Sequence, residues 1–438
     1  MGTLSVDKIL RTSTGASEFT LPATDGTVGQ VMQTDGAGQL SVAALAADTV
    51  TATQIAADAV GTSEIAALAV TASEIAATTI TPAQMANSAF LANRNMVING
   101  AMQVAQKATS KAALGAGVQT VDRWYTTKVN SGTWTQTQDA AVVGTAGFGY
   151  SLKNDCTTAL GSLAASDRLM MSYRFEGLNC QHLKKGTASA ESLTISFWVN
   201  ATKTGTYVLE LWDHDNARHI ASLYTVSVTN TWEKKTITFA GDTTGALDND
   251  NVKSLELHWY LAAGADYQSG TLPTSWGATA GGNRAVGQVN AADSTSNNFS
   301  LAGVQMEVGI TATPFENKTY DQELAACQRY CEKLHGEVTN SMVSMQLCYS
   351  TVGTEGVLYY SKKRAAPTIT QYSAGVTGWF IHYENTSVVV SAVPTFDTID
   401  SKTCRITALV ASGLTQGEAA YLRTGNAADS YIIVDAEL

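Results

Sequence analysis

Apolar residues recur every five positions through a ten-residue unit that is written four times in succession between Ala47 and Ala86. Two slots of the unit hold the larger apolar side chains, which are Val50, Ile55, Val60, Ile65, Val70, Ile75, Ile80 and Met85. A five-residue step turns an α-helix by about 500° and changes the face of a strand, so neither regular element keeps these side chains together. Capping boxes at residues 51–54, 71–74 and 81–84 indicate single helical turns joined by extended pieces.

One such unit has only two sizeable apolar residues and cannot bury them alone. Copies of the chain that run side by side would bury them along a common axis. The pattern therefore predicts that residues 46–95 form a slender multi-chain shaft, with the eight apolar residues as its core. We expect a homotrimer.

Alternating polar and apolar runs dominate residues 96–318. The predicted strands cover residues 121–129, 169–175, 193–199, 207–212, 220–228, 232–239, 255–261 and 299–308. Loops rich in Gly, Asn, Asp and Ser separate these strands, and the pattern predicts no helix between them. This arrangement is typical of a β-sandwich.

A connecting helix is predicted over residues 319–336. Thr319 and Gln322 form a capping box, and Gly336 is a typical C-terminal residue. The apolar face at helical spacing would contain Tyr320, Leu324, Cys327, Cys331 and Leu334. Alternation resumes in residues 337–438, which are predicted to form a second β-sandwich.

Residues 1–45 combine short alternating segments with two turn signals around 24–26 and 34–36. They contain few large apolar residues, so we expect them to be ordered only against a partner. The fold class is therefore mainly β: an elongated homotrimer with an N-terminal anchor, a repeat shaft, a β-sandwich, a short helix and a distal β-sandwich tip.

Composition and charge exclude several classes of protein. Charged residues make up 15% of the 438 positions, against roughly 25% in ordinary domains, and the net charge is −11. No basic run indicates nucleic-acid binding, and no apolar stretch of about 18 residues indicates membrane insertion. The start lacks a secretory signal, so we expect synthesis in a host cytoplasm and release by another route, such as lysis. The six cysteines are expected to be reduced core thiols.

Several segments, taken in order, resemble those of bacteriophage tail fibres. Residues 21–30 and 34–38 are similar to the starts of such fibres. Residues 93–104 and 121–124 resemble the entry into their jelly-roll module, and residues 303–309, 312–316 and 323–330 resemble its exit. Residues 364–370 resemble a segment of their distal domains.

The resemblance implies a homotrimeric virion component. Residues 1–45 would bind the tail, the baseplate or an adaptor protein, and the distal end would contact a host cell-surface polysaccharide. No self-cleaving C-terminal chaperone segment is recognised, so trimerisation is expected from the shaft, the helix and the sandwiches. No cofactor is implied.

Aromatic side chains are the candidate glycan-binding residues, because Trp and Tyr combine a flat apolar face with a polar group. The candidates are Trp276, Tyr359, Tyr372, Trp379, Tyr383 and Tyr421. Trp276 lies in a loop rich in Gly and Ser and could equally cover one end of the first sandwich. Strand alternation places Trp379 and Tyr383 on the same face, opposite Phe380 and His382, and one of these faces must be core.

Three alternatives remain open at this stage. A polysaccharide-degrading tailspike would need two carboxylates about 5–10 Å apart, for which Asp213 and Asp215 are candidates, with Glu210 and Glu256. The 213–216 segment is more typical of a turn, and no β-helix repeat follows Ala86.

Cys327, Cys331 and His335 have a spacing compatible with zinc, although hydrophobic packing explains the two cysteines equally well. A spacer fibre without receptor contact is the third alternative. We predict a non-enzymatic, metal-free tail fibre that binds host glycan and is localised in the virion.

Overall fold

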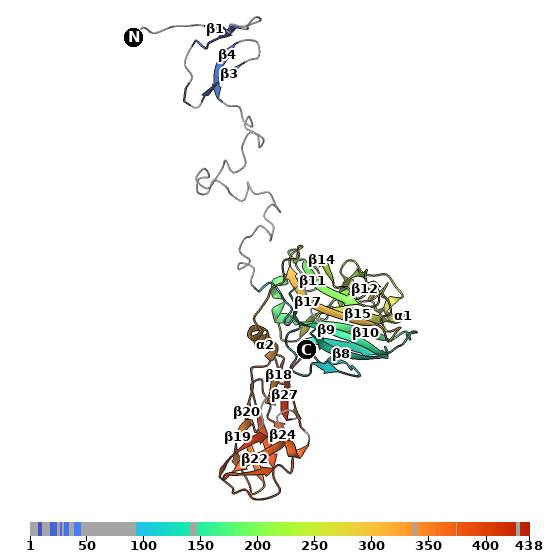
Figure 1. Ribbon diagram of the computed structural model, residues 1–438, viewed down its shortest axis with the longest axis vertical. Helices are drawn as coiled ribbons and strands as arrows, with labels where there is room; N and C mark the ends of the chain where they lie inside the picture. Colours follow the sequence, from blue (N-terminus) through green and yellow to red (C-terminus); the bar gives the residue numbers. More distant parts are fainter. Residues whose placement is uncertain are drawn as a thin grey trace, which may run out of the picture. The chain divides into compact units, whose positions relative to one another are not determined.

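The computed structural model describes residues 8–10, 18–23, 27–28, 30–34, 39–44, 93–140, 147–335, 340–373, 375–425 and 430–438. The protein is mainly β and divides into two compact units, Met1–Asn87 and Ser88–Leu438 (Figure 1). The ten-residue repeats, and with them every predicted shaft-core residue from Val50 to Met85, lie outside the described residues.

The N-terminal unit contains two antiparallel strand pairs. β1 (Lys8–Leu10) pairs with β2 (Glu18–Thr20), and β3 (Gln30–Thr34) pairs with β4 (Leu40–Ala44). The second pair lies on either side of the turn signal at residues 34–36. Consecutive apolar side chains on β3, Val31 and Met32, are 38% and 59% exposed. Because consecutive residues point to opposite faces of a strand, this hairpin shows apolar side chains on both faces.

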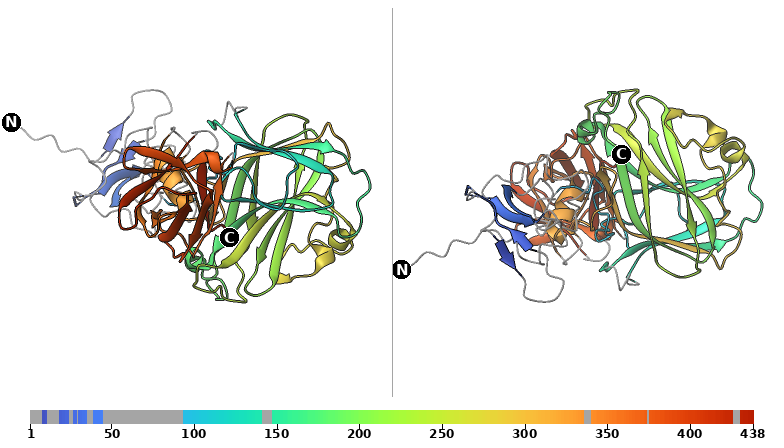
Figure 2. Two further views of the ribbon diagram at one scale, coloured as in Figure 1. Left: turned by 90° about the horizontal axis from the view of Figure 1, so that it is seen from below. Right: turned by 90° about the horizontal axis from the view of Figure 1, so that it is seen from above.

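The first part of the second unit is a sandwich of two antiparallel sheets, as predicted (Figure 2). One sheet contains, in spatial order, β16 (Gly277–Ala278), β13 (Arg218–Val226), β12 (Gly205–Asp213), β15 (Lys253–Ala263), β10 (Arg168–Glu176), β7 (Trp124–Val129) and β6 (Gly117–Val118). The other contains β14 (Glu233–Phe239), β11 (Leu193–Ala201), β17 (Asn298–Val308), β9 (Ser151–Thr158), β8 (Thr133–Asp139) and β5 (Ser110–Lys111). The chain passes repeatedly from one sheet to the other, and we call this part the jelly roll.

Strand alternation fills the space between the two sheets. On β12, Tyr207, Leu209 and Leu211 are fully buried in the core. Trp124 on β7 packs against Trp259 on β15, with their ring centroids 5.5 Å apart. Short helices lie in the loops: α1 (Ala265–Gln268), η2 (Gly177–Asn179), η3 (Gln181–Leu183) and η4 (Gly281–Asn283). None of the helices in the described ranges is long and apolar enough to cross a membrane.

The predicted connecting helix is shorter than expected. The capping box of Thr319 and Gln322 is present and begins α2 (Tyr320–Gln328). The helix does not continue to residue 336, because β18 (Cys331–Leu334) pairs with β27 (Tyr431–Asp435) near the end of the chain. The prediction was wrong beyond Gln328 because backbone hydrogen bonds to a strand about 100 residues away outweigh the local helical spacing of apolar residues.

The distal part of this unit is a second sandwich. Its larger sheet contains β23 (Thr386–Val389), β22 (Trp379–Tyr383), β26 (Ala419–Thr424), β19 (Met342–Cys348), β20 (Gly353–Tyr359), β25 (Thr403–Leu409) and β24 (Ala392–Asp397). Its smaller sheet contains β18, β27 and β21 (Thr368–Tyr372), and η5 (Val376–Gly378) precedes β22. Ile432 and Val434 of the smaller sheet pack with Trp379 and Ile381 of the larger one. We call this part the distal sandwich.

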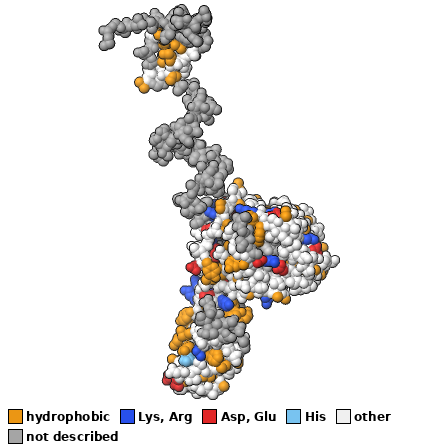
Figure 3. Space-filling view, viewed as in Figure 1, with side chains coloured by type: hydrophobic (Ala, Val, Ile, Leu, Met, Phe, Trp, Pro, Cys, Tyr) orange, Lys and Arg blue, Asp and Glu red, His pale blue; other side chains and the backbone are white. Residues whose placement is uncertain are grey.

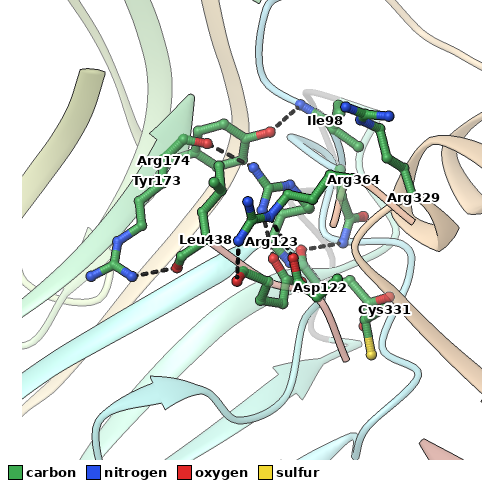
Figure 4. A network of polar contacts seen from close by, with 12 residues as sticks. Ile98, Asp122, Arg123, Tyr173, Arg174, Arg329, Cys331, Arg364 and Leu438 are labelled. Carbon is green, nitrogen blue, oxygen red and sulfur yellow. Dashed lines mark hydrogen bonds and ion pairs between the residues drawn. The ribbon is translucent and has the colours of Figure 1, made fainter. Parts of the chain in front are cut away.

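The last residues of the chain attach the distal sandwich to the jelly roll (Figure 4). Arg123, whose side chain is 2% exposed, forms an ion pair with Glu437 at 2.5 Å and lies 3.5 Å from the ring centroid of Tyr330. Arg174 of the jelly roll donates to the carbonyl oxygen of Leu438, and Arg364 of the distal sandwich donates to that of Asn251 in the jelly roll at 2.8 Å. The two sandwiches are therefore joined by buried, charge-assisted contacts.

Candidate functional site

A groove of about 370 Å³ lies between one edge of the jelly roll and the smaller sheet of the distal sandwich. The jelly roll contributes Lys107, Ala108, Lys111, Val118 and Gln119, and the distal sandwich contributes Thr368, Thr370, Tyr372, Tyr431, Ile433 and Asp435. The lining is mostly polar, with one pair of tyrosines. We refer to this site as the inter-sandwich groove.

Alternation along β21 and β27 gives the groove its distal wall. Residues 368, 370 and 372 of β21 are exposed, whereas Ile369 between them packs against the distal core. Residues 431, 433 and 435 of β27 share the groove face, whereas Ile432 and Val434 are buried in the core. The core residues therefore hold the wall in place, and the alternate residues line the groove, where those of β21 are exposed.

Two tyrosines form a stacked pair in this wall. Tyr372 and Tyr431 are direct cross-strand neighbours, with ring centroids 4.8 Å apart and an interplanar angle of 15°. Lys333 on β18 places its Nζ 4.3 Å from the ring centroid of Tyr431. Because β18 and β21 flank β27 on opposite sides, Lys333 and Tyr372 occupy opposite sides of Tyr431. The outer ring face of Tyr372, whose side chain is 45% exposed, is left for a ligand.

The charge in the groove is predominantly positive. Lys107 forms an ion pair with Asp435 at 2.6 Å. Burial alone would lower the pKa of Lys107, but the charges of Asp435 and its neighbours outweigh burial and raise this pKa. Lys111 and Lys333 are exposed, and no carboxylate in the described part of the chain pairs with either. Burial is the main cause that raises the pKa of Tyr431, and the nearby Tyr372 raises it further. The hydroxyl of Tyr431 is therefore neutral at pH 7.

Of the six aromatic candidates, only Tyr372 lines the inter-sandwich groove. Trp379 and Tyr383 are 0% and 5% exposed in the distal core, so neither can offer a ring face to a glycan. The structure corrects these two candidates, and alternation along β22 is the reason. Trp276 is partly buried against the jelly-roll core, and its indole Nε1 donates to the carbonyl of Ala240 at 2.7 Å. Trp276 therefore covers one end of the sandwich.

Tyr359 and Tyr421 lie on the outer face of the larger distal sheet, away from its core. Tyr359 is 72% exposed, and the ring of Tyr421 lies 4.7 Å from that of His382. The same face carries the apolar Met345, Leu347 and Val357, which are 61%, 49% and 46% exposed, together with the ion-paired Glu355 and Arg405. Figure 3 shows hydrophobic side chains gathered on the surface of the distal sandwich. We call the two tyrosines and these three apolar residues the outer apolar face.

The carboxylates considered for catalysis are held in other roles. Asp213 is fully buried and accepts hydrogen bonds from Lys185 and from the backbone N–H of Asn216, which closes the turn between β12 and β13. The side chain of Asp215 accepts from the backbone N–H of Asp248 at 3.0 Å and ties this turn to a second one. Both residues therefore stabilise turns.

Glu210 and Glu256 lie in one buried network on the face of the jelly roll that points away from its core. Burial alone would raise the pKa of Glu210, but the charge of Arg284 and hydrogen bonds from His219 and His258 hold it well below its usual range. His258 bridges the two carboxylates. Burial alone would raise the pKa of Glu256, but the charge of His258, hydrogen bonds from His214 and His258, and the charge of Arg174 together hold it well below its usual range. A general acid needs a raised pKa, so neither carboxylate is suited to that role.

The cysteine and histidine spacing considered for zinc is not formed. Cys327 lies on α2 and Cys331 on β18, so the helical spacing that would align them with His335 is absent. Burial raises the pKa of both thiols well above the usual value, which favours the uncharged form. Within the described ranges no group of three or more His, Cys, Asp or Glu side chains could hold a metal ion.

Sequence reasoning missed most of the groove. Tyr431 begins a predicted strand, but its pairing with Tyr372 depends on the register of strands about 60 residues apart. The three lysines carried no signal, because isolated lysines on a polar chain usually mark solvated surface. The alternation of threonines in 368–372 was the only local indication that this strand has a polar exposed face.

Comparisons with known proteins find similar solved structures but do not assign the chain to a family. No family model matches the sequence, and no curated protein matches it. Among solved structures, the enzymatically active domain of tailspike protein 4 from bacteriophage CBA120 is 11% identical, with a TM-score of 0.26. This match covers 49% of our chain and 21% of the tailspike chain.

Carbohydrate-binding modules are also similar at this level. The TmCBM61 module in complex with β-1,4-galactotriose is 8% identical over 49% of our chain and 99% of its own, with a TM-score of 0.24. The family 11 module from Clostridium thermocellum in complex with a mixed-linked tetrasaccharide is 12% identical over 47% of our chain and 99% of its own, with a TM-score of 0.23. At these TM-scores the likeness does not assign a function, so the proposal below rests on residues of this chain.

Proposed function

We propose that this protein is a non-enzymatic bacteriophage tail fibre that binds a host cell-surface polysaccharide in the inter-sandwich groove. The observation that carries the proposal is the stacked pair of Tyr372 and Tyr431 in a polar groove of about 370 Å³. The outer face of Tyr372 can stack on the C–H surface of a sugar ring. The surrounding Thr, Gln and Lys side chains supply donors and acceptors for hydroxyl groups.

The non-enzymatic part of the proposal is supported by the carboxylates of the jelly roll. The pKa values of Glu210 and Glu256 are held low by basic partners, and Asp213 and Asp215 close turns. Among the described residues, the groove is lined by one carboxylate, Asp435, which is paired with Lys107. Glycoside hydrolysis ordinarily requires two carboxyl groups across the bond that is cleaved.

The homotrimer is proposed from the repeats and from the outer apolar face. Exposed apolar patches rimmed by polar residues are typical of surfaces that bind protein. Within this face, Arg405 and Glu355 are cross-strand neighbours of Val357 and Leu347, and Arg405 pairs with Glu355 at 3.5 Å and with Asp397 at 2.7 Å. Both signs of charge on one face suit contact between copies of the same chain. Three copies of one groove on a fibre would raise its avidity for a repeating polysaccharide.

The N-terminal unit is proposed to attach the fibre to the tail, the baseplate or an adaptor. The exposure of Val31 and Met32 on its hairpin supports a protein partner for this unit. Deletion of residues 1–45 should leave a fibre that still binds cells but is not incorporated into particles. Normal incorporation of the truncated fibre would remove the anchor role.

Binding of the full-length protein to an array of bacterial capsular polysaccharides and lipopolysaccharides tests the proposed function. Wild type should bind a subset of these glycans, and the double variant Tyr372→Ala/Tyr431→Ala should lose that binding while it remains folded. Incubation with the bound glycan should release no reducing ends. Catalytic release of oligosaccharides would favour a tailspike enzyme, and absence of all binding would favour a spacer fibre.

A further inference from the structure

We propose that the inter-sandwich groove selects an anionic polysaccharide, whose carboxylate or phosphate groups contact Lys111 and Lys333. This inference rests on the proposed function, because it specifies the glycan that the same groove would bind. It is carried by the arrangement of charge in the groove, whereas the glycan proposal is carried by the stacked tyrosines.

The first observation is the sign of the charge. The chain carries 38 acidic against 27 basic residues, yet among the described residues two lysines and one aspartate line this groove, and Lys333 lies next to its Tyr431. Asp435 is already neutralised by Lys107 at 2.6 Å. Lys111 and Lys333 therefore remain as the local excess of positive charge. The chain as a whole is acidic and repels an anionic ligand, so a local excess of positive charge directs such a ligand to this groove.

The second observation is the position of the two lysines relative to the tyrosine pair. Lys333 stands on β18, with its Nζ 4.3 Å from the ring centroid of Tyr431, and so belongs to the distal wall. Lys111 stands on β5 and belongs to the jelly-roll wall. Lys333 lies beyond Tyr431, on the side of the stacked pair opposite to the free face of Tyr372, so a single sugar on Tyr372 would not touch it. A polymer that stacks on Tyr372 and continues across the distal wall would place different acidic groups near Lys111 and near Lys333.

The third observation is that these ammonium groups have no competing partner. Within the part of the chain that the structure describes, no carboxylate lies within ion-pair distance of Lys111 or Lys333. A lysine ammonium is a compact charge with three donors and binds carboxylate and phosphate oxygens alike. An anionic ligand would therefore pair with free charges and would break no existing ion pair.

The test uses the same glycan array in three forms: native, carboxyl-reduced and dephosphorylated. The full-length protein should bind anionic members and should lose them when either the carboxylates or the phosphates are removed, which identifies the source of the charge. Lys111→Ala and Lys333→Ala should each weaken binding about two- to five-fold, as expected for exposed ion pairs. Lys234→Ala, which removes an exposed lysine from β14, is the matched control and should change nothing.

The outcomes separate this inference from the proposed function. Binding that depends on Tyr372 and Tyr431 but survives neutralisation of the glycan would overturn the anionic selection and leave the groove as a glycan site. Binding that is insensitive to the two tyrosines, or no binding at all, would overturn the proposed function itself. Raising the ionic strength should weaken binding by wild type more than binding by the double variant Lys111→Ala/Lys333→Ala.

Discussion

Two faces of the distal sandwich carry exposed tyrosines, and they differ in almost everything around those rings. In the inter-sandwich groove, Tyr372 stacks on Tyr431 between lysines and threonines. On the outer apolar face, Tyr359 is more exposed but stands among Met345 and Leu347. Exposure of an aromatic ring therefore does not by itself indicate a sugar site. A polar, partly enclosed setting suits a glycan, whereas an open apolar setting suits another protein surface.

The largest effect is expected from a change at the C-terminal residues, because their contacts join the two sandwiches that form the walls of the groove. In Glu437→Gln the buried Arg123 loses its carboxylate partner at 2.5 Å. Removing one partner of a buried ion pair costs about 3–5 kcal/mol of unfolding free energy. Denaturation in urea should show this loss, whereas Glu418→Gln, at an exposed site, should not. Unchanged stability of Glu437→Gln would mean that the groove does not depend on this contact.

The next effect concerns Asp122, which lies beside the same junction and accepts hydrogen bonds from Gln106. Burial, reinforced by the nearby charge of Glu437 and opposed by the hydrogen bonds from Gln106, raises the pKa of Asp122 from 3.8 to about 7. The folded protein therefore binds this proton more tightly than the unfolded chain. The stabilisation is fully present below about pH 4 and is lost as the pH rises to about 7.

Asp122→Asn tests this prediction, because it removes the titrating group. Between about pH 4 and about pH 7, wild type should lose stability relative to Asp122→Asn. The loss, measured as unfolding free energy, should be on the order of 4 kcal/mol at most. Urea denaturation across this pH range measures it. A difference that is the same at every pH would show that Asp122 does not titrate in this window.

A smaller effect is expected on the outer apolar face. Met345→Lys and Leu347→Lys place charges where we propose that copies of the chain meet, and each should cost about 1.5–3 kcal/mol of apolar burial per chain. The assembly should dissociate at lower denaturant concentration in analytical ultracentrifugation, while the exposed positions leave the monomer fold intact. Tyr372→Ala should leave assembly unchanged. If Tyr372→Ala weakened assembly as much as the two lysine variants do, the outer apolar face would not be the specific contact between copies of the chain.

Much of the fold could be predicted from alternation alone. Residues 193–199 and 379–383 were expected to be strands, and both are, with their alternate apolar residues in a core. The stretch from 331 to 334 could not be predicted, because its strand state depends on pairing with β27 and its apolar spacing also fits a helix. Local sequence specifies which face a residue occupies, whereas distant pairing specifies which strands exist.

The candidate site was less predictable for the same reason. Tyr372 could be named from the sequence, but its partner Tyr431 is defined only by the register of β21 and β27. The opposite wall, with Lys107 and Lys111, comes from a segment more than 250 residues earlier in the chain. Trp379 was indistinguishable from Tyr372 as an aromatic residue in a predicted strand, and only packing shows that it is core.

The measurement that tests the central claim most directly compares the two faces in one experiment. Isothermal titration calorimetry of a glycan taken from the array would be performed with full-length wild type, Tyr372→Ala and the matched control Tyr359→Ala. Our account predicts that Tyr372→Ala weakens binding about tenfold or more, a loss of ~1.4 kcal/mol or more, and that Tyr359→Ala binds like wild type. Loss of binding in Tyr359→Ala with normal binding in Tyr372→Ala would contradict it and would place the glycan on the outer apolar face.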